Sequence, residues 1–116
     1  MTKPLERSIT VLHHELAIMS GYIERSIDNM AKVIAERDQA LITQVVADDD
    51  LIDQAEKRIE QLCTCTIARY KPSAQDLREI TAIFKIITDL ERIGDHCSDI
   101  ALLVRDMGEG PYIKEL

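Results

Sequence analysis

Apolar residues recur at alternating intervals of three and four along most of this chain, the spacing that lines them up on one face of an α-helix. A nearly unbroken first row predicts a helix over residues 5–36, and a less regular second row predicts another over residues 38–70. Residues 74–107 carry two parallel rows, and so wide an apolar face suits packing against two neighbours. The first of these rows consists of Ile83, Ile86, Leu90, Ile93, Cys97, Ile100 and Val104, and the second of Leu77, Ile80, Phe84 and Ile87.

Residues that end or begin helices stand at the limits of these segments. Asp38 is placed to accept a hydrogen bond from the first free amides of the second helix. Pro72 stops that helix, and Ser73 with Asp76 resembles a capping box for the next one. Gly108 follows the last periodic residue, where helices commonly terminate.

The three predicted helices are of nearly equal length, roughly 50 Å each at 1.5 Å per residue. Equal lengths favour an all-α fold, an elongated antiparallel three-helix bundle. We expect the bundle to span residues 1–107, with residues 108–116 as a linker or tail. Burying one residue of a helix row stabilises by roughly 1.5–3 kcal/mol, so Ile93→Asp is expected to unfold the domain.

Two pairs of carboxylates stand four residues apart on different predicted helices: Asp49 with Asp53, and Glu91 with Asp95. Four-residue spacing places both members of a pair on one helix face. Counted from the shared end of an antiparallel bundle, the two pairs lie at the same depth to within roughly 2 Å. We therefore expect Asp49 to face Asp95 and Asp53 to face Glu91, with Gly94 leaving room beside them.

Converging carboxylates repel one another unless they are protonated or bridged by a cation. Oxygen-only ligands suit hard cations such as Mg, Mn, Ca or iron, so one reading is a metal site with one or several ions. The other reading is a solvated acidic stripe. In that reading Glu56 and Glu60 continue an even spread of charge, and Arg58 and Arg92 neutralise it.

Composition narrows the class of protein. The net charge of -7 disfavours binding to nucleic acid or to an anionic membrane surface. No apolar run approaches the roughly 20 residues of a membrane span, and no signal-peptide core is evident, so we expect a cytosolic protein. Cys63, Cys65 and Cys97 are interpreted as buried thiols, because two helical cysteines two residues apart could not reach one ion.

No arrangement typical of an active site appears in the sequence. His13 and His14 are adjacent and diverge by about 100° on a helix, so they could not face one ion. There is no Glu-x-x-His pair, no Gly-rich phosphate loop and no Gly-x-Ser-x-Gly elbow. We expect no catalytic residues and no enzymatic activity.

The segment Asp89-Leu90-Glu91-Arg92-Ile93-Gly94-Asp95, followed by Cys97 and Asp99, resembles the motif of the PhoU family of phosphate-uptake regulators. The resemblance extends through residues 72–78 and 49–53 and covers most of residues 1–107. It implies three-helix bundles whose Glu/Asp-x-x-x-Asp motifs bind metal clusters, usually iron or zinc and sometimes Mg or Mn. It makes Asp49, Asp53, Glu91 and Asp95 metal ligands, with Asp99 as a peripheral ligand or a solvated carboxylate.

The resemblance also implies a cytosolic, non-enzymatic adaptor that works with the phosphate-specific ABC transporter and its sensor histidine kinase and restrains phosphate uptake and starvation signalling. Family members usually carry two tandem bundles, whereas this chain holds one. We expect either an N-terminal fragment or a half-length relative that dimerises. A metal-dependent phosphate-ester hydrolase and a purely structural bundle are the alternatives.

Overall fold

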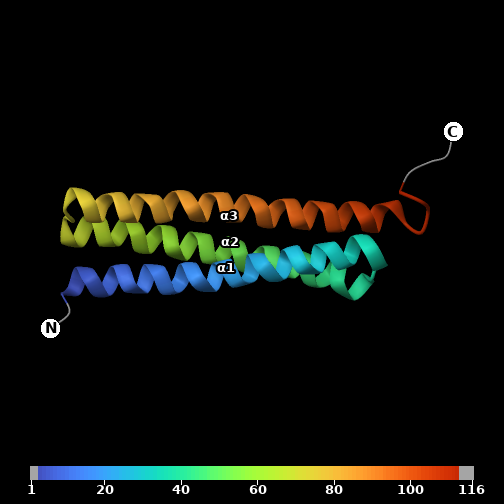
Figure 1. Cartoon of the computed structure of the whole chain (residues 1–116), viewed down its shortest axis with the longest axis horizontal. Coiled ribbons are helices and arrows are strands. Elements are labelled where there is room, and N and C mark those ends of the chain that lie inside the picture. The colour runs from blue at the N-terminus through green and yellow to red at the C-terminus, as the bar shows by residue number, and fades with distance from the viewer. Residues whose placement is uncertain (1–2, 113–116) are drawn as a thin grey trace.

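The computed structural model describes residues 3–112, which form three long helices joined by short turns (Figure 1). They are α1 (Pro4–Glu36), α2 (Gln39–Tyr70) and α3 (Ala74–Met107). Each helix packs against the other two, and the molecule measures 65 × 26 × 16 Å. α1 and α3 run in the same direction and α2 runs opposite to both (Figure 1). The predicted three-helix bundle and its helix limits are confirmed to within one residue.

Local hydrogen bonds explain why the helices begin where they do. The Asp38 carboxylate accepts a hydrogen bond of 2.8 Å from the amide of Ala40 at the start of α2. The Ser73 hydroxyl accepts one of 3.3 Å from the amide of Asp76 at the start of α3. Each bond satisfies an amide that has no partner within its helix, which stabilises a helix by about 1 kcal/mol.

The core consists of two apolar clusters along the bundle axis. One cluster joins the first half of α1, the second half of α2 and the first half of α3, and the other fills the opposite end. Between them lies a layer in which the buried residues are small or polar: Ser26, Asp48, Gly94 and Ser98. This polar layer between the two apolar clusters places charged side chains in the middle of the bundle.

One edge of the apolar face of α3 lies outside the core. Ile93 is 39% exposed and Ile86 is 43% exposed, whereas Ile87 and Ile80 are almost completely buried. The expected burial of Ile93 is therefore wrong, and the expectation that Ile93→Asp unfolds the domain loses its structural basis. The face is wider than the groove that α1 and α2 offer it, so the buried strip draws on both predicted rows.

The cysteine interpretation holds for two of the three thiols. Cys63 and Cys97 are buried, but Cys65 is exposed. Two residues correspond to about 200° of helical rotation, so Cys65 must point away from the core into which Cys63 points.

The first residues after α3 fold back onto the turn between α1 and α2. The Arg37 guanidinium donates a hydrogen bond to the Gly108 carbonyl and lies 3.9 Å from the centroid of the Tyr112 ring. The Tyr112 hydroxyl donates to the Ile34 carbonyl over 2.6 Å. Of the expected tail, residues 113–116 lie outside the described residues. Within residues 3–112, no helix combines the length and apolarity that crossing a bilayer requires.

Candidate metal centre

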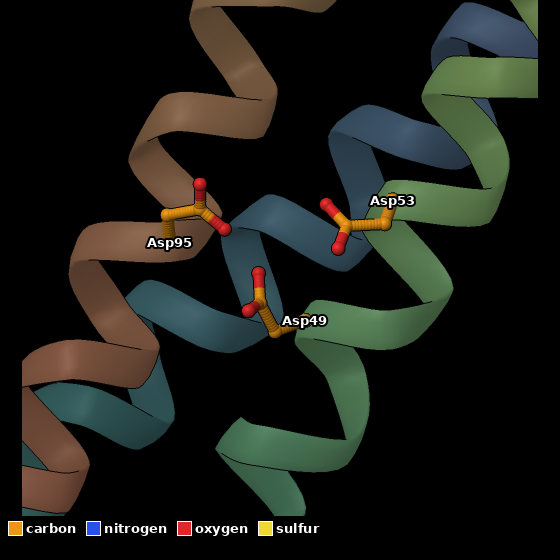
Figure 2. Close-up of side chains that lie close together, drawn as sticks. All are labelled: Asp49, Asp53 and Asp95. Atoms are coloured by element: carbon orange, nitrogen blue, oxygen red, sulfur yellow. The ribbon is translucent and has the colours of Figure 1, made fainter.

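Three carboxylates meet in the polar layer at the middle of the bundle. Asp49 and Asp53 project from α2 and Asp95 from α3, and one oxygen of each lies within 4.8 Å of the others. Figure 2 shows the three side chains turned toward one another between α2 and α3, with α1 passing behind. All three are partly buried.

Glu91 completes the pairing expected from helix depth. Its carboxyl group neighbours those of Asp53 and Asp95, which help to raise its pKa, but it is not among the three carboxylates whose oxygens lie within 4.8 Å of one another. The structure thus brings Asp49 beside Asp95 and Asp53 beside Glu91. Asp99 is exposed and is not among the carboxylates that converge, although it stands one turn beyond Asp95 on a similar face of α3.

Gly94 provides the space in which the carboxylates sit. A Cβ atom at this position would lie 3.0 Å from Ile52 Cδ1 and 3.4 Å from Asp49 Oδ1. A side chain here would press on Ile52 and crowd the Asp49 carboxylate. Glycine therefore allows α3 to approach α2 closely at the level of the site.

Asp49 lacks compensation for its negative charge. Its Oδ1 atom is buried and has no hydrogen-bond partner. Burial, and then the charges of Asp95 and Asp53, raise the pKa of Asp49 to about 7. Burial, and then hydrogen bonds with Asp95 and Asp53, raise the pKa of Glu91 to about 8. Ionising all of these carboxyl groups at once is therefore unfavourable, and binding a proton or a cation reduces the repulsion between them.

Glu56 belongs to the same electrostatic neighbourhood, although the sequence had placed it in the solvated stripe. Burial raises the pKa of Glu56, followed by the charges of Glu60, Asp53 and Asp95. Its position three residues after Asp53, on the same helix face, could have indicated that Glu56 lies beside the acidic pair.

Asp48 is a second residue that the sequence reasoning missed, and it has a different role. It is completely buried, and the Arg25 guanidinium donates to its two carboxylate oxygens over 2.6 and 2.8 Å. The Gln44 amide donates a third hydrogen bond over 2.9 Å. Asp48 is therefore a satisfied structural ion pair between α1 and α2. Its place in the apolar row between Val45 and Ile52 could have indicated burial.

The arginines expected to neutralise an acidic stripe do not serve the convergent group. Arg58 donates to Glu15 of α1 over 3.2 Å. Arg92 is exposed and makes no ion pair with any residue among 3–112. Aspartate and glutamate oxygens, a buried orphan acceptor and a space kept open by glycine together fit a hard cation.

Comparison with known proteins agrees with the motif. The profile of the PhoU domain matches residues 16–104. Over 104 residues the chain is 36% identical to the phosphate-specific transport system accessory protein PhoU homolog of Clostridium acetobutylicum, covering 89% of this chain and 48% of that protein. The homolog of Pseudomonas aeruginosa is 38% identical over 104 residues, covering 87% and 43%. That of Aquifex aeolicus is 38% identical over 96 residues, covering 83% and 43%.

The chain spans less than half the length of these relatives. The matched region contains both acidic pairs and most of each helix. From the family profile and from the identity over most of its length, the chain belongs to the PhoU family.

Proposed function

We propose that this chain is a metal-binding accessory protein of a phosphate-specific transport system. The observation that best supports a metal site is Asp49 Oδ1, which is buried without a hydrogen-bond partner. The carboxylates around it form no ion pair with a positively charged side chain in the described part of the chain. Asp49, Asp53, Glu91 and Asp95 would hold the metal, with Glu56 beside them. When bound, it would supply positive charge that joins α2 to α3 without a catalytic step.

The transport role comes from the relatives, which are named as accessory proteins of phosphate-specific transport systems. On the family resemblance, we propose that the chain works in the cytoplasm as a homo-oligomeric adaptor and is not an enzyme. It would contact the phosphate ABC transporter and its sensor histidine kinase, and would restrain uptake and starvation signalling when phosphate is plentiful.

The family resemblance favours iron or zinc, and the ligand chemistry narrows the choice. All the convergent donors are carboxylate oxygens, and the buried Cys97 thiol is not among them. Oxygen donors favour iron, Mn or Mg, while thiolate and imidazole donors are more typical of zinc. We therefore propose iron first, with Mn and Mg as substitutes.

Elemental analysis of the natively purified chain tests the metal. We expect at least one equivalent of metal in the wild type and in Asp50→Asn, and a loss of most of it in Asp49→Asn and Asp95→Asn. Asp50 is the matched control because it follows Asp49 directly on the same helix but is exposed. A wild-type chain that holds no metal and is not stabilised by added Fe or Mn would refute the site.

Uptake of labelled phosphate by cells at high external phosphate tests the regulatory role. Deleting the gene that encodes the chain should raise uptake, and the wild-type gene should restore restraint. If the metal serves this role, Asp49→Asn should fail to restore it and Asp50→Asn should succeed. Unchanged uptake after deletion would contradict the proposed restraint.

A further inference from the structure

A groove lies between α1 and α2 at the end of the bundle where α1 begins and α2 ends (Figure 1). It contains two adjoining hollows of about 250 and 130 Å³, which share Ser8, Leu62, Thr66 and Tyr70. The larger hollow is completed by Pro4, Arg7 and Val11, and the smaller by Cys65 and Arg69. We call this surface the α1–α2 groove.

The groove has apolar walls that the bundle leaves open to solvent. Val11 is 45% exposed, and Leu62 and Tyr70 are half-buried. A concave apolar surface of this kind accommodates an apolar side chain of a ligand, because moving that side chain out of water is favourable. Along each helix the lining residues rise by roughly 10–12 Å, which is the length of three or four residues of extended chain.

The lining of the groove carries positive charge and no carboxylate. Arg7 and Arg69 are both exposed, and neither makes an ion pair with any residue among 3–112. From Gln61 to Lys71, α2 contains no acidic residue. The groove is therefore locally positive in a chain whose net charge is -7.

The two arginines border different hollows, and this arrangement favours one kind of ligand. The Arg69 guanidinium lies 5.7 Å from the centroid of the Tyr70 ring, which keeps its charge beside the apolar wall. Arginine pairs strongly with carboxylates, often through two parallel hydrogen bonds. A peptide segment can bring one carboxylate to each arginine and an apolar side chain to the hollow between them.

The groove is separate from the candidate metal centre. Thr66 stands thirteen residues after Asp53 on α2, which corresponds to roughly 20 Å along the helix axis. A ligand in the groove therefore neither contacts nor requires the convergent carboxylates, and the inference goes beyond the proposed function.

We propose that the α1–α2 groove binds a short acidic peptide segment of a partner protein. One large apolar side chain of the segment occupies the larger hollow against Val11 and Leu62. Aspartate or glutamate residues on either side of this anchor pair with Arg7 and Arg69. Charge complementarity excludes a basic segment, which the two arginines would repel.

Selection from a phage-displayed library of random peptides on the immobilised chain tests this proposal. Physiological salt screens the repulsion between acidic peptides and the chain as a whole. Peptides that the wild type retains, and that the double variant Arg7→Ala/Arg69→Ala does not, are expected to carry Asp or Glu on both sides of Leu, Phe or Trp.

Fluorescence anisotropy with labelled copies of the selected peptides measures the contribution of each residue. Arg7→Ala and Arg69→Ala should each weaken binding by roughly tenfold, the loss expected for one hydrogen bond between charged groups. Val11→Glu should weaken it by at least as much, because it places a carboxylate beside the larger hollow.

Matched controls come from α3, outside the groove. Arg92→Ala removes an exposed arginine, and Leu103→Glu places a carboxylate at an apolar position that is 60% exposed. Both variants should bind the selected peptides like the wild type. Circular dichroism should show an unchanged helix content in every variant, since all the replaced side chains are exposed.

Cys65 reports whether a bound peptide occupies the groove. It is exposed and lines the smaller hollow, whereas Cys63 and Cys97 are buried. Because alkylation of a thiol requires access, a saturating amount of a selected peptide should slow the reaction of Cys65 with iodoacetamide several-fold.

A library that yields no peptide, or peptides that bind the double variant as tightly as the wild type, would overturn the proposal. Peptides that bind but leave the alkylation of Cys65 unchanged would place their site elsewhere and would also overturn it. If only octanoate, a small anion with an apolar body, protects Cys65, the groove takes a small ligand and the peptide is refuted.

Discussion

Asp48 and Asp49 are neighbours on α2, yet only Asp48 has a partner for its charge. Arg25 donates to both oxygens of Asp48, whereas Asp49 Oδ1 is buried without a hydrogen-bond partner. Adjacent residues diverge by about 100° on a helix, so one carboxylate turns to α1 and the other to α3. The first holds the bundle together, and the second leaves a negative charge for a ligand to neutralise.

Removing the counter-charge of Asp48 should destabilise the fold. Arg25→Ala leaves a buried carboxylate unpaired, and we expect the free energy of unfolding to fall by about 2–3 kcal/mol, below the full cost of a buried pair because Arg25 is itself half exposed. Chemical denaturation measures the change. Arg92→Ala, at an exposed arginine without an ion pair among residues 3–112, should change it by less than about 0.5 kcal/mol. Equal effects in both variants would contradict the assigned role of Asp48.

The metal-free chain should lose stability as the pH rises from about 4 to 8. Folding raises the pKa of Asp49 to about 7 and of Glu91 to about 8, so in this range the folded state retains protons that the unfolded state has released. Stability is therefore fully present below the unfolded pKa values and declines as the pH passes through the folded ones. Thermal melts in the presence of a chelator, over this pH range, measure the dependence for the wild type and for the double variant Asp49→Asn/Glu91→Gln. The melting temperature of the double variant should depend less on pH. A wild-type melting temperature that rises with pH relative to that of the double variant would contradict the raised pKa values.

The fold was predictable because each helix carries its own apolar row and its own end signals. Asp38 and Ser73 cap α2 and α3 as expected, and equal helix lengths then leave few arrangements. The convergence of Asp49 with Asp95 followed from counting residues from one end, since a helix rises by a fixed distance per residue.

The rest depended on contacts that only the packed structure defines. The sequence of α3 contains two apolar rows, and it does not show which edge of them α1 and α2 cover. Ile93 was therefore predicted to lie in the core, whereas it lies at the border of the core. The partner of Asp48 is 23 residues away in α1, and no spacing rule connects Arg25 with it. Metal binding by the five predicted ligands stays a prediction.

The two sides of α3 should respond very differently to a charge. Ile87→Asp places a carboxylate in a core position that is 1% exposed, which should cost more than about 4 kcal/mol and unfold the chain. Ile93→Asp, at a position 39% exposed, should lower the stability of the monomer by less than about 1 kcal/mol. Denaturant titration at a concentration where the chain is monomeric measures both. Unfolding by Ile93→Asp in the monomer would restore the sequence-based assignment of the core.

Two glycines in helices should respond to alanine with opposite signs. Gly94→Ala brings a Cβ to 3.0 Å from Ile52, so we expect a loss of about 1–3 kcal/mol through overpacking. The new methyl group would also crowd Asp49, and metal content should fall. Gly21→Ala meets no atom within 4 Å and should stabilise α1 by about 0.5–1 kcal/mol through helix propensity. Thermal melts of the two variants measure the difference, and a stabilising Gly94→Ala would show that α2 and α3 are not closely packed there.

Metal binding should stabilise the chain and should do so through Asp49. A cation that binds only the folded state adds about 2.7 kcal/mol at one hundred times its dissociation constant, or roughly 10 °C in melting temperature for a domain of this size. Because the cation displaces protons from Asp49 and Glu91, its effect should weaken as the pH falls below about 7. Thermal melts with and without Fe or Mn, at about pH 6 and pH 8, measure this stabilisation. The rise in melting temperature on adding metal should persist in Asp50→Asn and be lost in Asp49→Asn. A shift of equal size in Asp49→Asn would mean that the ion binds elsewhere, and the orphaned oxygen would need another explanation.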